Sequence, residues 1–434
     1  MRQKMRRFVR NSRALRKNKL RTAAVRIFEA GLKAVEPARA VAKRVRVTRT
    51  GVTIDDFEFL FGKSGRVFVV AVGKCAASAG RALEKVLGRS LTGGVVADIA
   101  EDASFRKLRY FKGTHPTPSA QNREASEAII TLLRNLTEED AVLFVVSGGG
   151  SALLYNSDDI SPEEEARMMQ RLSREGATIV EMNTIRKHLS TCRGGNLAKY
   201  AYPARSAALI ISDIPSNDIQ FVASGPTVRD TTTVQEAAAI LEKYRVLETC
   251  DVPHCRLLET PKEDKYFQNM RNILFLSHME ALQAMKEEAE RLGLAADVCG
   301  ACVVGESRTI GALMTEGLHK AAPHSALLYG GETTVVLRGE GKGGRNQEFV
   351  LSALPHLREG ELIASVASDG WDNTPHAGAL GDVLTRRRAE ELGLNPQDFL
   401  ERNDSFTFFE AVGDAVLTGR LGSNVADLFV ALKE

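Results

Sequence analysis

The chain has 434 residues, of which 44% are hydrophobic and 26% are charged, and its formal net charge is +3. This length exceeds the size at which a single hydrophobic core usually keeps growing, so we expect two domains. Six cysteines exclude a disulfide scaffold, and the absence of an apolar run near the roughly 20 residues that span a bilayer excludes a membrane protein, so we expect a cytoplasmic protein with reduced thiols.

The positive charge is concentrated at the start of the chain. The first 22 residues contain ten Lys or Arg and no acidic residue, so the remainder is net negative. A negative body disfavours nucleic-acid binding outside this segment. We expect residues 1–21 to be a solvated basic extension; contact with RNA or anionic lipid, or service as an Arg-rich targeting peptide, are the alternatives, and the low serine content weakens the last.

The first half of the chain alternates short apolar runs with amphipathic helical segments. This rhythm predicts βαβ units with a mostly parallel sheet covered by helices. The active residues of such a sheet lie in loops beyond the carboxyl ends of the strands. The predicted strands are RVFVVAVG (66–73), GGVVADIA (93–100), AVLFVVSG (141–148) and SAALIISDIP (206–215).

A polar segment from about residue 252 is typical of an interdomain crossing, and a second α/β alternation follows it. NILFLS (272–277) predicts a strand and HMEALQAMKEEAERLG (278–293) a helix, and TTVVLRG (333–339) alternates like a half-exposed strand. Cys299 and Cys302 lie in the apolar stretch AADVCGACVVG. We expect them to be buried thiols in or near a strand rather than half of a zinc site.

Two glycine-rich loops and several basic residues are candidates for anion binding. Lys74 follows a predicted strand and precedes a helix, where backbone N–H groups favour an anion. A short basic span ends in two glycines, and Lys342 and Arg345 stand in the glycine-rich loop GKGGRNQE. Cations beside such loops suit phosphate or carboxylate binding. The candidates are Ser147, Gly148, Gly149, Gly150, Ser151, Arg186, His188, Arg193, Gly194, Gly343, Gly344, Arg345 and Asn346.

Acidic residues also follow predicted strands. Asp213 and Asp218 in SDIPSND suit Mg²⁺ coordination or proton acceptance from a hydroxyl, and capping or turn formation is the alternative; Asp369 in ASDGWDN repeats the pattern. A set of cations, acids and glycine loops with no Ser/His/Asp triad favours phosphoryl transfer, which depends on positioning and charge. The loop SGGGS lacks the G-x-G-x-x-G spacing of a dinucleotide site.

The chain resembles the glycerate 2-kinase family, whose C-terminal domain is the MOFRL module and whose members have also been named hydroxypyruvate reductases. The matching stretches cover nearly the whole chain from about residue 22. They are AVGKCA, SGGGSALL, EMNTIRKHLSTCRGGNLA, LIISDIPSND, ASGPTVRDTTT, GGETTVVLRGEGKGGRNQEF, ASDGWDNTPHAGA and TGRLGSNVADL.

The resemblance implies an ATP- and Mg²⁺-dependent kinase that phosphorylates the 2-hydroxyl of D-glycerate, giving 2-phosphoglycerate and ADP. It implies a Rossmann-like N-terminal α/β/α sandwich over 22–255 and a smaller α/β domain over 256–434, whose last segment packs back on the first domain, with the active site in the cleft between them. Lys74, Arg345 and Asp213 are the implied catalytic residues. Asp213 and Asp218 are the metal candidates.

The chain departs from the family pattern at three places, so the resemblance implies the chemistry more firmly than the exact acid. Ser216, Asn217 and Asp218 stand where relatives read GDD. SDGWDNTP, with the bulky Trp371, replaces TDGxDGP, and Arg420 and Leu421 stand in place of Pro and Thr. The alternatives are a kinase of a related 2-hydroxy sugar acid, an NAD(P)H-dependent hydroxypyruvate reductase, and a catalytically silent nucleotide- or sugar-acid-binding protein. The expected partners are ATP and a small acid, with homodimer formation left open.

Overall fold

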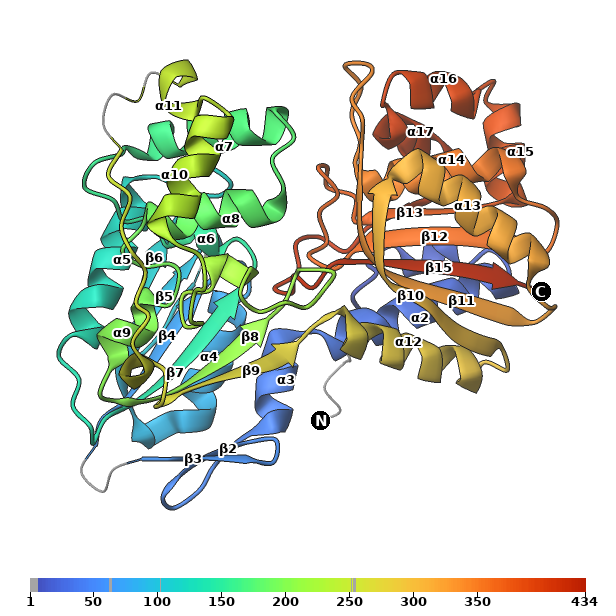
Figure 1. The fold of residues 1–434 in the computed structure, drawn as a ribbon. Coiled ribbons are helices and arrows are strands. Elements are labelled where there is room, and N and C mark those ends of the chain that lie inside the picture. The colour runs from blue at the N-terminus through green and yellow to red at the C-terminus, as the bar shows by residue number, and fades with distance from the viewer. Residues whose placement is uncertain (1–6, 62–64, 102, 251, 253–254) are drawn as a thin grey trace. The chain divides into compact units, whose positions relative to one another are not determined.

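The computed structural model describes residues 7–61, 65–101, 103–250, 252 and 255–434. The chain forms two compact units (Figure 1). Residues Pro37–Phe275 form one, called here the central unit, and Met1–Glu36 together with Leu276–Glu434 form the other, called the terminal unit. This division differs from the linear one expected at residues 255 and 256 for two reasons: the first helices pack with the C-terminal half of the chain, and the strand Met270–Leu276 joins the sheet of the central unit.

A six-stranded sheet forms the core of the central unit, with strand order β6-β5-β4-β7-β8-β9. Every pairing from β6 to β8 is parallel. In chain order this is 3-2-1-4-5-6, the Rossmann order, so the topology reverses between β4 and β7, and ligands bind beyond the carboxyl ends of the strands at such a reversal. The strands are β4 (Val67–Val72), β5 (Leu91–Asp98), β6 (Leu108–Lys112), β7 (Ala141–Ser147), β8 (Arg205–Ile211) and β9 (Met270–Leu276).

Helices cover this sheet, and a small antiparallel sheet lies beside it (Figure 1). The helices are α3 (Pro37–Arg44), α4 (Ala76–Leu87), α5 (Ala120–Leu133), α6 (Gly150–Leu153), α7 (Pro162–Arg174), α8 (Ile179–His188), α9 (Asn196–Ala201), α10 (Val234–Lys243) and α11 (Val246–Thr249), with 3-10 turns η1 (Gly88–Ser90), η2 (Val222–Ser224) and η3 (Asp264–Tyr266). The small sheet consists of β1 (Val45–Val47), β2 (Gly51–Ile54) and β3 (Phe57–Leu60).

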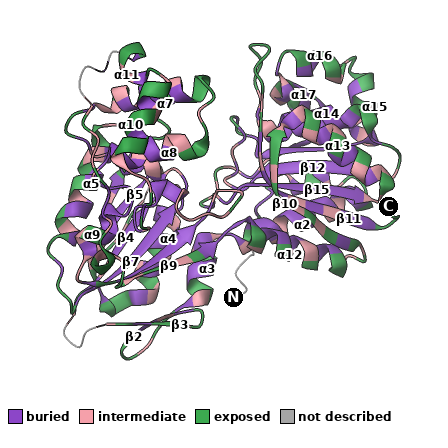
Figure 2. Cartoon of the chain, viewed as in Figure 1, coloured by how far each residue is buried: buried purple, intermediate pink, exposed green. Residues whose placement is uncertain are grey.

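The central strand β7 shows why the apolar run at 141–147 folds as it does. All seven of its residues are buried, and Figure 2 shows buried residues along β4 and β7. A strand covered by helices on both faces has no polar face, so its sequence is continuously apolar rather than alternating. The four predicted strands of the first half are therefore confirmed as β4, β5, β7 and β8.

The terminal unit contains a second six-stranded sheet, which is mostly antiparallel and has the order β10-β11-β15-β12-β13-β14. Only β10 and β11 pair in parallel. The strands are β10 (Ala295–Glu306), β11 (Ser325–Thr334), β12 (Glu361–Ala367), β13 (Gly378–Asp382), β14 (Ala415–Val416) and β15 (Asp427–Lys433). The register places Gly331 of β11 and Ala367 of β12 on either side of Asp427, so three strand ends meet at one edge of the sheet.

Both faces of this sheet are also covered by helices. Along β15, Phe429 and Ala431 pack into the core formed with α13 and α14, and Leu428 faces Gly31 of α2. The helices are α1 (Ser12–Leu15), α2 (Lys19–Ala34), α12 (His278–Arg291), α13 (Ser307–Lys320), α14 (Arg345–Ala353), α15 (Val383–Glu391), α16 (Pro396–Glu401) and α17 (Ser405–Val412), with the 3-10 turn η4 (Leu354–His356). None of the helices in the described part of the chain has both the length and the apolar character needed to cross a bilayer.

The basic N-terminal segment is folded where the structure describes it. Val9 and Leu15 are fully buried, and the Arg21 side chain has no solvent exposure. The Arg21 guanidinium contacts Asp382 at 2.5 Å and Asp414 at 2.7 Å. The expectation of a solvated extension is therefore wrong from residue 8 onward, because the apolar residues between the basic ones pack into the terminal unit; residues 1–6 lie outside the described part.

Two local predictions in the second half are also wrong. Cys299 and Cys302 do lie in a strand, but both are exposed, because β10 is the edge strand of its sheet. The strand predicted at 333–339 ends at Thr334, and Leu337 beyond it is 80% exposed. In both cases the apolar pattern is real, but the fold supplies no neighbour to cover it.

Candidate functional site

The first group of candidate residues lies at the topological reversal of the central sheet. Lys74 follows β4, and the loop 147–151 follows β7, which pairs directly with β4. The N–H of Lys74 donates to the carbonyl of Gly148 at 2.9 Å. The buried Ser147 hydroxyl donates to Val72 O at 3.2 Å and accepts from the N–H of Cys75 at 3.1 Å. Ser147 therefore ties the two loops together rather than facing a ligand.

Gly149 has a conformation and a neighbourhood that suit a binding loop. Its φ of +80° lies in the left-handed region, which favours glycine. A Cβ at this position would lie 3.1 Å from Cγ of Lys74 and 3.2 Å from Cδ2 of His115. Among the turns and loops that the structure describes, no backbone carbonyl accepts from the N–H of Gly148 or Gly149. The loop thus presents two backbone donors beside a lysine and a histidine.

His115 is a site residue that the sequence did not reveal. It follows β6 and is exposed as a whole residue, but its ring lies against Gly149. The loss of solvation, and then the positive charges of Lys74 and Arg186, lower the pKa of His115 to about 4. The ring is therefore neutral at physiological pH. Lys74 and His115 flank Gly149, and the charge of Arg186 reaches the ring of His115, so we call these three residues the basic cluster.

Asp213 lies near the loop of Lys74, and the carboxylate of Asp218 binds a neighbouring residue of its own loop. Burial, and then the charge of Asp98, raise the pKa of Cys75; the charge of Asp213 also raises it, which places Asp213 near the loop of Lys74. Both carboxylate oxygens of Asp218 accept hydrogen bonds from Gln220, at 3.1 and 2.7 Å. Within the described ranges, no three acidic, His or Cys side chains are grouped as metal ligands.

The N-terminus of α4 is occupied by a side chain of the protein itself. The carboxylate of Asp98 accepts from the N–H of Ala77 at 2.7 Å and from that of Ile99 at 2.6 Å. We expected this helix start to bind an anion beside Lys74. It does hold one, but the anion is the buried Asp98 carboxylate, so a ligand at Lys74 must be bound by the side chain and by the neighbouring glycine loop.

Two further candidates from the basic span are buried and have internal partners. Both ring nitrogens of His188 are engaged, Nδ1 with Leu258 O at 2.7 Å and Nε2 with the Thr232 hydroxyl at 3.2 Å. The Arg193 guanidinium donates to Glu165 at 2.8 Å and is fully buried. These side chains hold the loop in place and face no open surface, unlike the partly exposed Arg186.

Gly194 and Ser151 are likewise used within the protein. The N–H of Gly194 donates to Ser224 O at 2.9 Å. The Ser151 hydroxyl lies 2.9 Å from that of Ser224, which donates to Asn183 at 2.8 Å. These contacts fix the glycine loops against η2, so they support the shape of the site without facing a ligand.

The second group of candidates lies at the edge of the terminal sheet where β11, β12 and β15 meet. Arg345 begins α14, and its guanidinium contacts Asp427 at 2.5 Å and also contacts Glu332. Burial opposes the positive charge, but the carboxylates of Asp427 and Glu332 outweigh it and raise the pKa of Arg345. Arg345 is therefore a permanently charged group fixed in place by two acids.

The N-terminus of α14 is occupied by the carboxylate of Asp372. This side chain accepts from the backbone N–H of Asn346 at 3.1 Å and of Gln347 at 2.9 Å. Burial, and then the charge of Asp427, raise the pKa of Asp372 to about 6. Asn346 is fully buried and donates to the same carboxylate, so it has a structural role, and Gly344 lies against Asp372.

Asp369 precedes a pair of residues that distinguish this chain. Its carboxylate accepts from the N–H of Trp371 at 2.9 Å, and its carbonyl accepts from that of Leu421 at 2.7 Å. The Arg420 guanidinium lies 4.0 Å from the centre of the Trp371 ring, a cation–π contact. The two departures from the family pattern at Trp371 and Arg420 are thus in contact with each other.

The sequence contains weak signals for the residues that it did not reveal. His115 stands in a Pro- and Thr-rich turn after the short strand β6, which was not predicted. Asp98 ends a strand in the run GGVVAD, a position typical of site residues in parallel sheets. Glu332 and Asp427 stand in motifs that the chain shares with the family, but only the pairing of β11 with β15 brings these two acids together.

A doubly wound α/β unit with basic side chains around a glycine turn at its topological reversal belongs to the class of enzymes that act on small anions. Comparison with known proteins defines the class further. A domain of unknown function, DUF4147, matches residues 23–259, and the MOFRL family matches residues 325–427.

Relatives match over nearly the full length. The D-glycerate 2-kinase of Thermotoga maritima is 33% identical over 95% of this chain and 98% of its own, and the glycerate 2-kinase of Pyrococcus horikoshii is 33% identical over 95% and 97%. The crystal structure of the Thermotoga maritima glycerate kinase superposes with a TM-score of 0.82 at 31% identity, covering 96% of this chain and 99% of the other. The chain belongs to the glycerate 2-kinase family.

Proposed function

We propose that this protein transfers the γ-phosphoryl group of ATP to the 2-hydroxyl of D-glycerate, giving 2-phosphoglycerate and ADP. The observation that carries the proposal is the basic cluster of Lys74, His115 and Arg186 around Gly149, in a chain of this family. A glycine turn with two backbone donors and two permanent cations suits a carboxylate or a phosphoryl group, which are the anions of this reaction.

Each group in the central unit has a proposed role. Lys74 neutralises charge on the transferring phosphoryl group, and Arg186 with the N–H groups of Gly148 and Gly149 binds the carboxylate of the acid. Asp213 accepts the proton of the attacking 2-hydroxyl as it bonds to phosphorus and the bond to the ADP oxygen breaks. His115, neutral and beside Lys74, orients the acid by hydrogen bonding.

In the terminal unit, Arg345 is the proposed cation for the phosphates of the donor. Its two acidic partners hold the guanidinium in one orientation, which suits bidentate contact with phosphate oxygens. Mg²⁺ is commonly bound by one or two carboxylates plus substrate phosphates, and Asp213, which follows β8 near the loop of Lys74, suits that limited role. Bound Mg²⁺ would offset the negative charge of the phosphates.

The direct test is turnover with ATP, Mg²⁺ and D-glycerate. We expect ADP release that depends on the acid, and a product that enolase converts, because enolase accepts 2-phosphoglycerate and not the 3-isomer. L-glycerate and other C3 and C4 2-hydroxy acids form the control panel. Turnover with another acid alone would move the proposal to a related sugar-acid kinase, and the absence of turnover across the panel would refute it.

The remaining alternatives predict different readouts in the same preparation. A hydroxypyruvate reductase oxidises NADH in the presence of hydroxypyruvate, for which the SGGGS loop lacks the usual pyrophosphate spacing. A catalytically silent binding protein is stabilised against heat by ATP or glycerate without phosphate transfer.

A further inference from the structure

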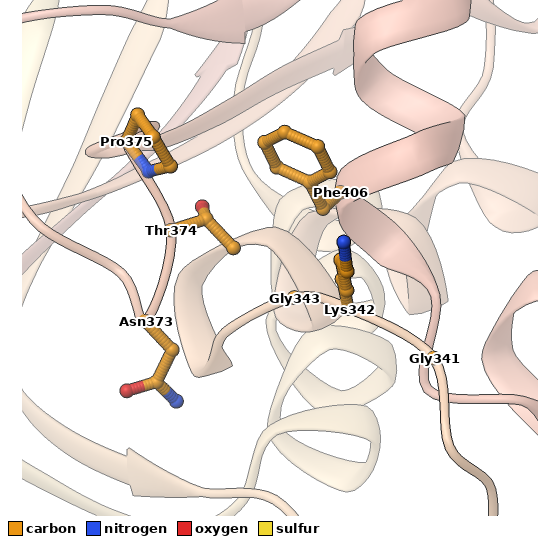
Figure 3. A pocket seen from close by; sticks show the side chains of 7 residues that line it. All are labelled: Gly341, Lys342, Gly343, Asn373, Thr374, Pro375 and Phe406. Carbon is orange, nitrogen blue, oxygen red and sulfur yellow. The ribbon is translucent and has the colours of Figure 1, made fainter.

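A cavity of about 460 Å³ opens on the terminal unit beside the loop that precedes Arg345 (Figure 3). Its walls come from three segments that are far apart in the sequence. They are Gly341, Lys342 and Gly343, then Asn373, Thr374 and Pro375, and finally Phe406 of α17. In Figure 3, Phe406 and Lys342 stand on one side of the opening, and Thr374 and Pro375 on the other.

The aromatic wall of this cavity is rigid. The ring of Phe406 stacks on that of the buried His376, with centroids 4.4 Å apart and planes inclined by 26°. The N–H of Phe406 donates to Lys342 O at 2.9 Å, and the N–H of Lys342 donates to Asp404 at 3.1 Å. The ring and the glycine-rich loop therefore hold each other in place, as expected of a preformed ligand pocket.

The wall also carries a charged side chain. Lys342 is exposed at the cavity and carries a positive charge. The buried Ser405 hydroxyl lies behind this wall, against Gly343, and does not line the cavity.

We infer that this cavity binds the adenine and ribose of the phosphoryl donor, an inference that rests on the proposed use of ATP. An aromatic face, a proline opposite it and a nearby lysine suit a purine base followed by phosphates. Glycerate has roughly a third as many non-hydrogen atoms as adenosine and would leave most of this volume empty. The N-terminus of α14 is taken by Asp372, so the phosphates must be met by side chains such as Lys342 and Arg345.

The test is photolabelling of the full-length protein with an azido-adenine analogue of ATP and Mg²⁺, followed by tryptic mapping. We expect label in the peptides 359–386 and 403–420, which contain Asn373 to Pro375 and Phe406, and loss of label when excess ATP is added. Label confined to other peptides would overturn the inference. Because this readout needs no turnover, it remains informative if the proposed reaction itself is not observed.

Substitution of Phe406 gives a second, kinetic test. Phe406→Ala is expected to raise the KM for ATP about tenfold and to leave the KM for D-glycerate within about twofold, because a stacked base contributes roughly that much binding. Phe406→Trp should restore the KM for ATP. Phe57→Ala, at a partly exposed phenylalanine of the central unit, is the matched control.

Substitution of Lys342 gives a third test of the cavity. Lys342→Ala should raise the KM for ATP several-fold, whereas Lys320→Ala, which removes an exposed charge from α13 of the same unit, should leave it unchanged. A rise in the KM for D-glycerate instead of ATP in the Phe406 and Lys342 variants would overturn the inference by assigning the cavity to the acid.

Discussion

The loops 147–151 and 339–344 are both rich in glycine, but their glycines serve different purposes. Gly149 has a φ of +80° and faces the side chains of Lys74 and His115. In the second loop no glycine has a positive φ, and a Cβ at Gly343 would lie 2.1 Å from the Ser405 hydroxyl. Glycine in the first loop permits a backbone conformation, and in the second it permits close packing.

The difference shows that glycine content alone does not identify an anion site. At Gly339 and Gly341 a Cβ would lie 2.7 and 2.5 Å from backbone atoms of Arg402, so the loop is packed against the end of α16. What distinguishes the loop 147–151 is a left-handed glycine, Gly149, that lies against the side chains of Lys74 and His115. The following predictions test that distinction.

The largest effect is expected from the cation of the first loop. Lys74→Ala should reduce kcat by at least about 100-fold, because it removes a charge from the transferring phosphoryl group. The melting temperature should change little, since the backbone of Lys74 keeps its bond to Gly148. Lys85→Ala, at an exposed lysine of α4, is the control, and equal activity in both variants would contradict the role of Lys74.

The cation of the terminal unit should behave differently, because it is paired with buried acid. Arg345→Ala should reduce kcat by a similar factor and also lower the free energy of unfolding by about 3 kcal/mol, since Asp427, whose side chain is 1% exposed, loses its partner. Denaturant unfolding measures the second effect.

The double variant Arg345→Ala with Asp427→Asn separates the two effects. It should regain most of the stability, because the buried charge is removed with its partner, and none of the activity. Recovery of activity would show that Arg345 acts only by neutralising Asp427.

The next largest effect is expected on stability, from substitution of Gly343, which packs against Ser405. Gly343→Ala should lower the free energy of unfolding by about 1–3 kcal/mol, because the added methyl group overlaps the Ser405 hydroxyl. Ser405→Ala in the same chain should remove most of that loss, as measured by denaturant unfolding. If the double variant is no more stable than the single one, packing against Ser405 is not the reason for glycine here.

Gly149, whose role is conformational, should not regain its lost stability when a neighbouring side chain is shortened. Gly149→Ala is expected to cost about 1 kcal/mol of stability through its positive φ and to lower kcat/KM at least tenfold, because the methyl group displaces Lys74 and His115. His115→Ala makes room for the methyl group but leaves φ unchanged, so the stability loss should persist in the double variant. Thermal melting and initial rates measure the two quantities.

The sequence predicts the first loop better than the second for a physical reason. The runs at 66–73 and 141–148 are apolar strands of a parallel layer, so their carboxyl ends meet and bring Lys74 to Gly149. The approach of His115 could not be predicted, because it depends on which edge of the sheet β6 occupies.

The burial of the charged candidates also could not be predicted from the sequence, because their partners are far away along the chain. Arg193 is paired with Glu165, 28 residues earlier, and the carboxylate that occupies the start of α14 comes from Asp372, 26 residues after Asn346. Basic residues before a glycine pair resemble an anion clamp, and only the fold shows that Arg193 is paired with an acid in the core whereas Arg186 is partly exposed.

The smallest expected effect is a difference between His115 and Asp372 in how lowering the pH changes the stability of the protein. The pKa of His115 is lowered from 6.5 to about 4, so between these pH values the unfolded chain binds more protons than the folded one, and His115 makes acidification destabilising. The pKa of Asp372 is raised from 3.8 to about 6, so the folded chain binds more protons there, and acidification is stabilising.

Urea unfolding at about pH 7 and about pH 5 measures the free energy of unfolding that is lost on acidification. This loss should be smaller in His115→Asn and larger in Asp372→Asn than in the wild type. Each substitution also removes contacts at every pH, so the quantity that tests the prediction is the change with pH of the difference between variant and wild type, and slopes of the same sign for both variants would contradict it.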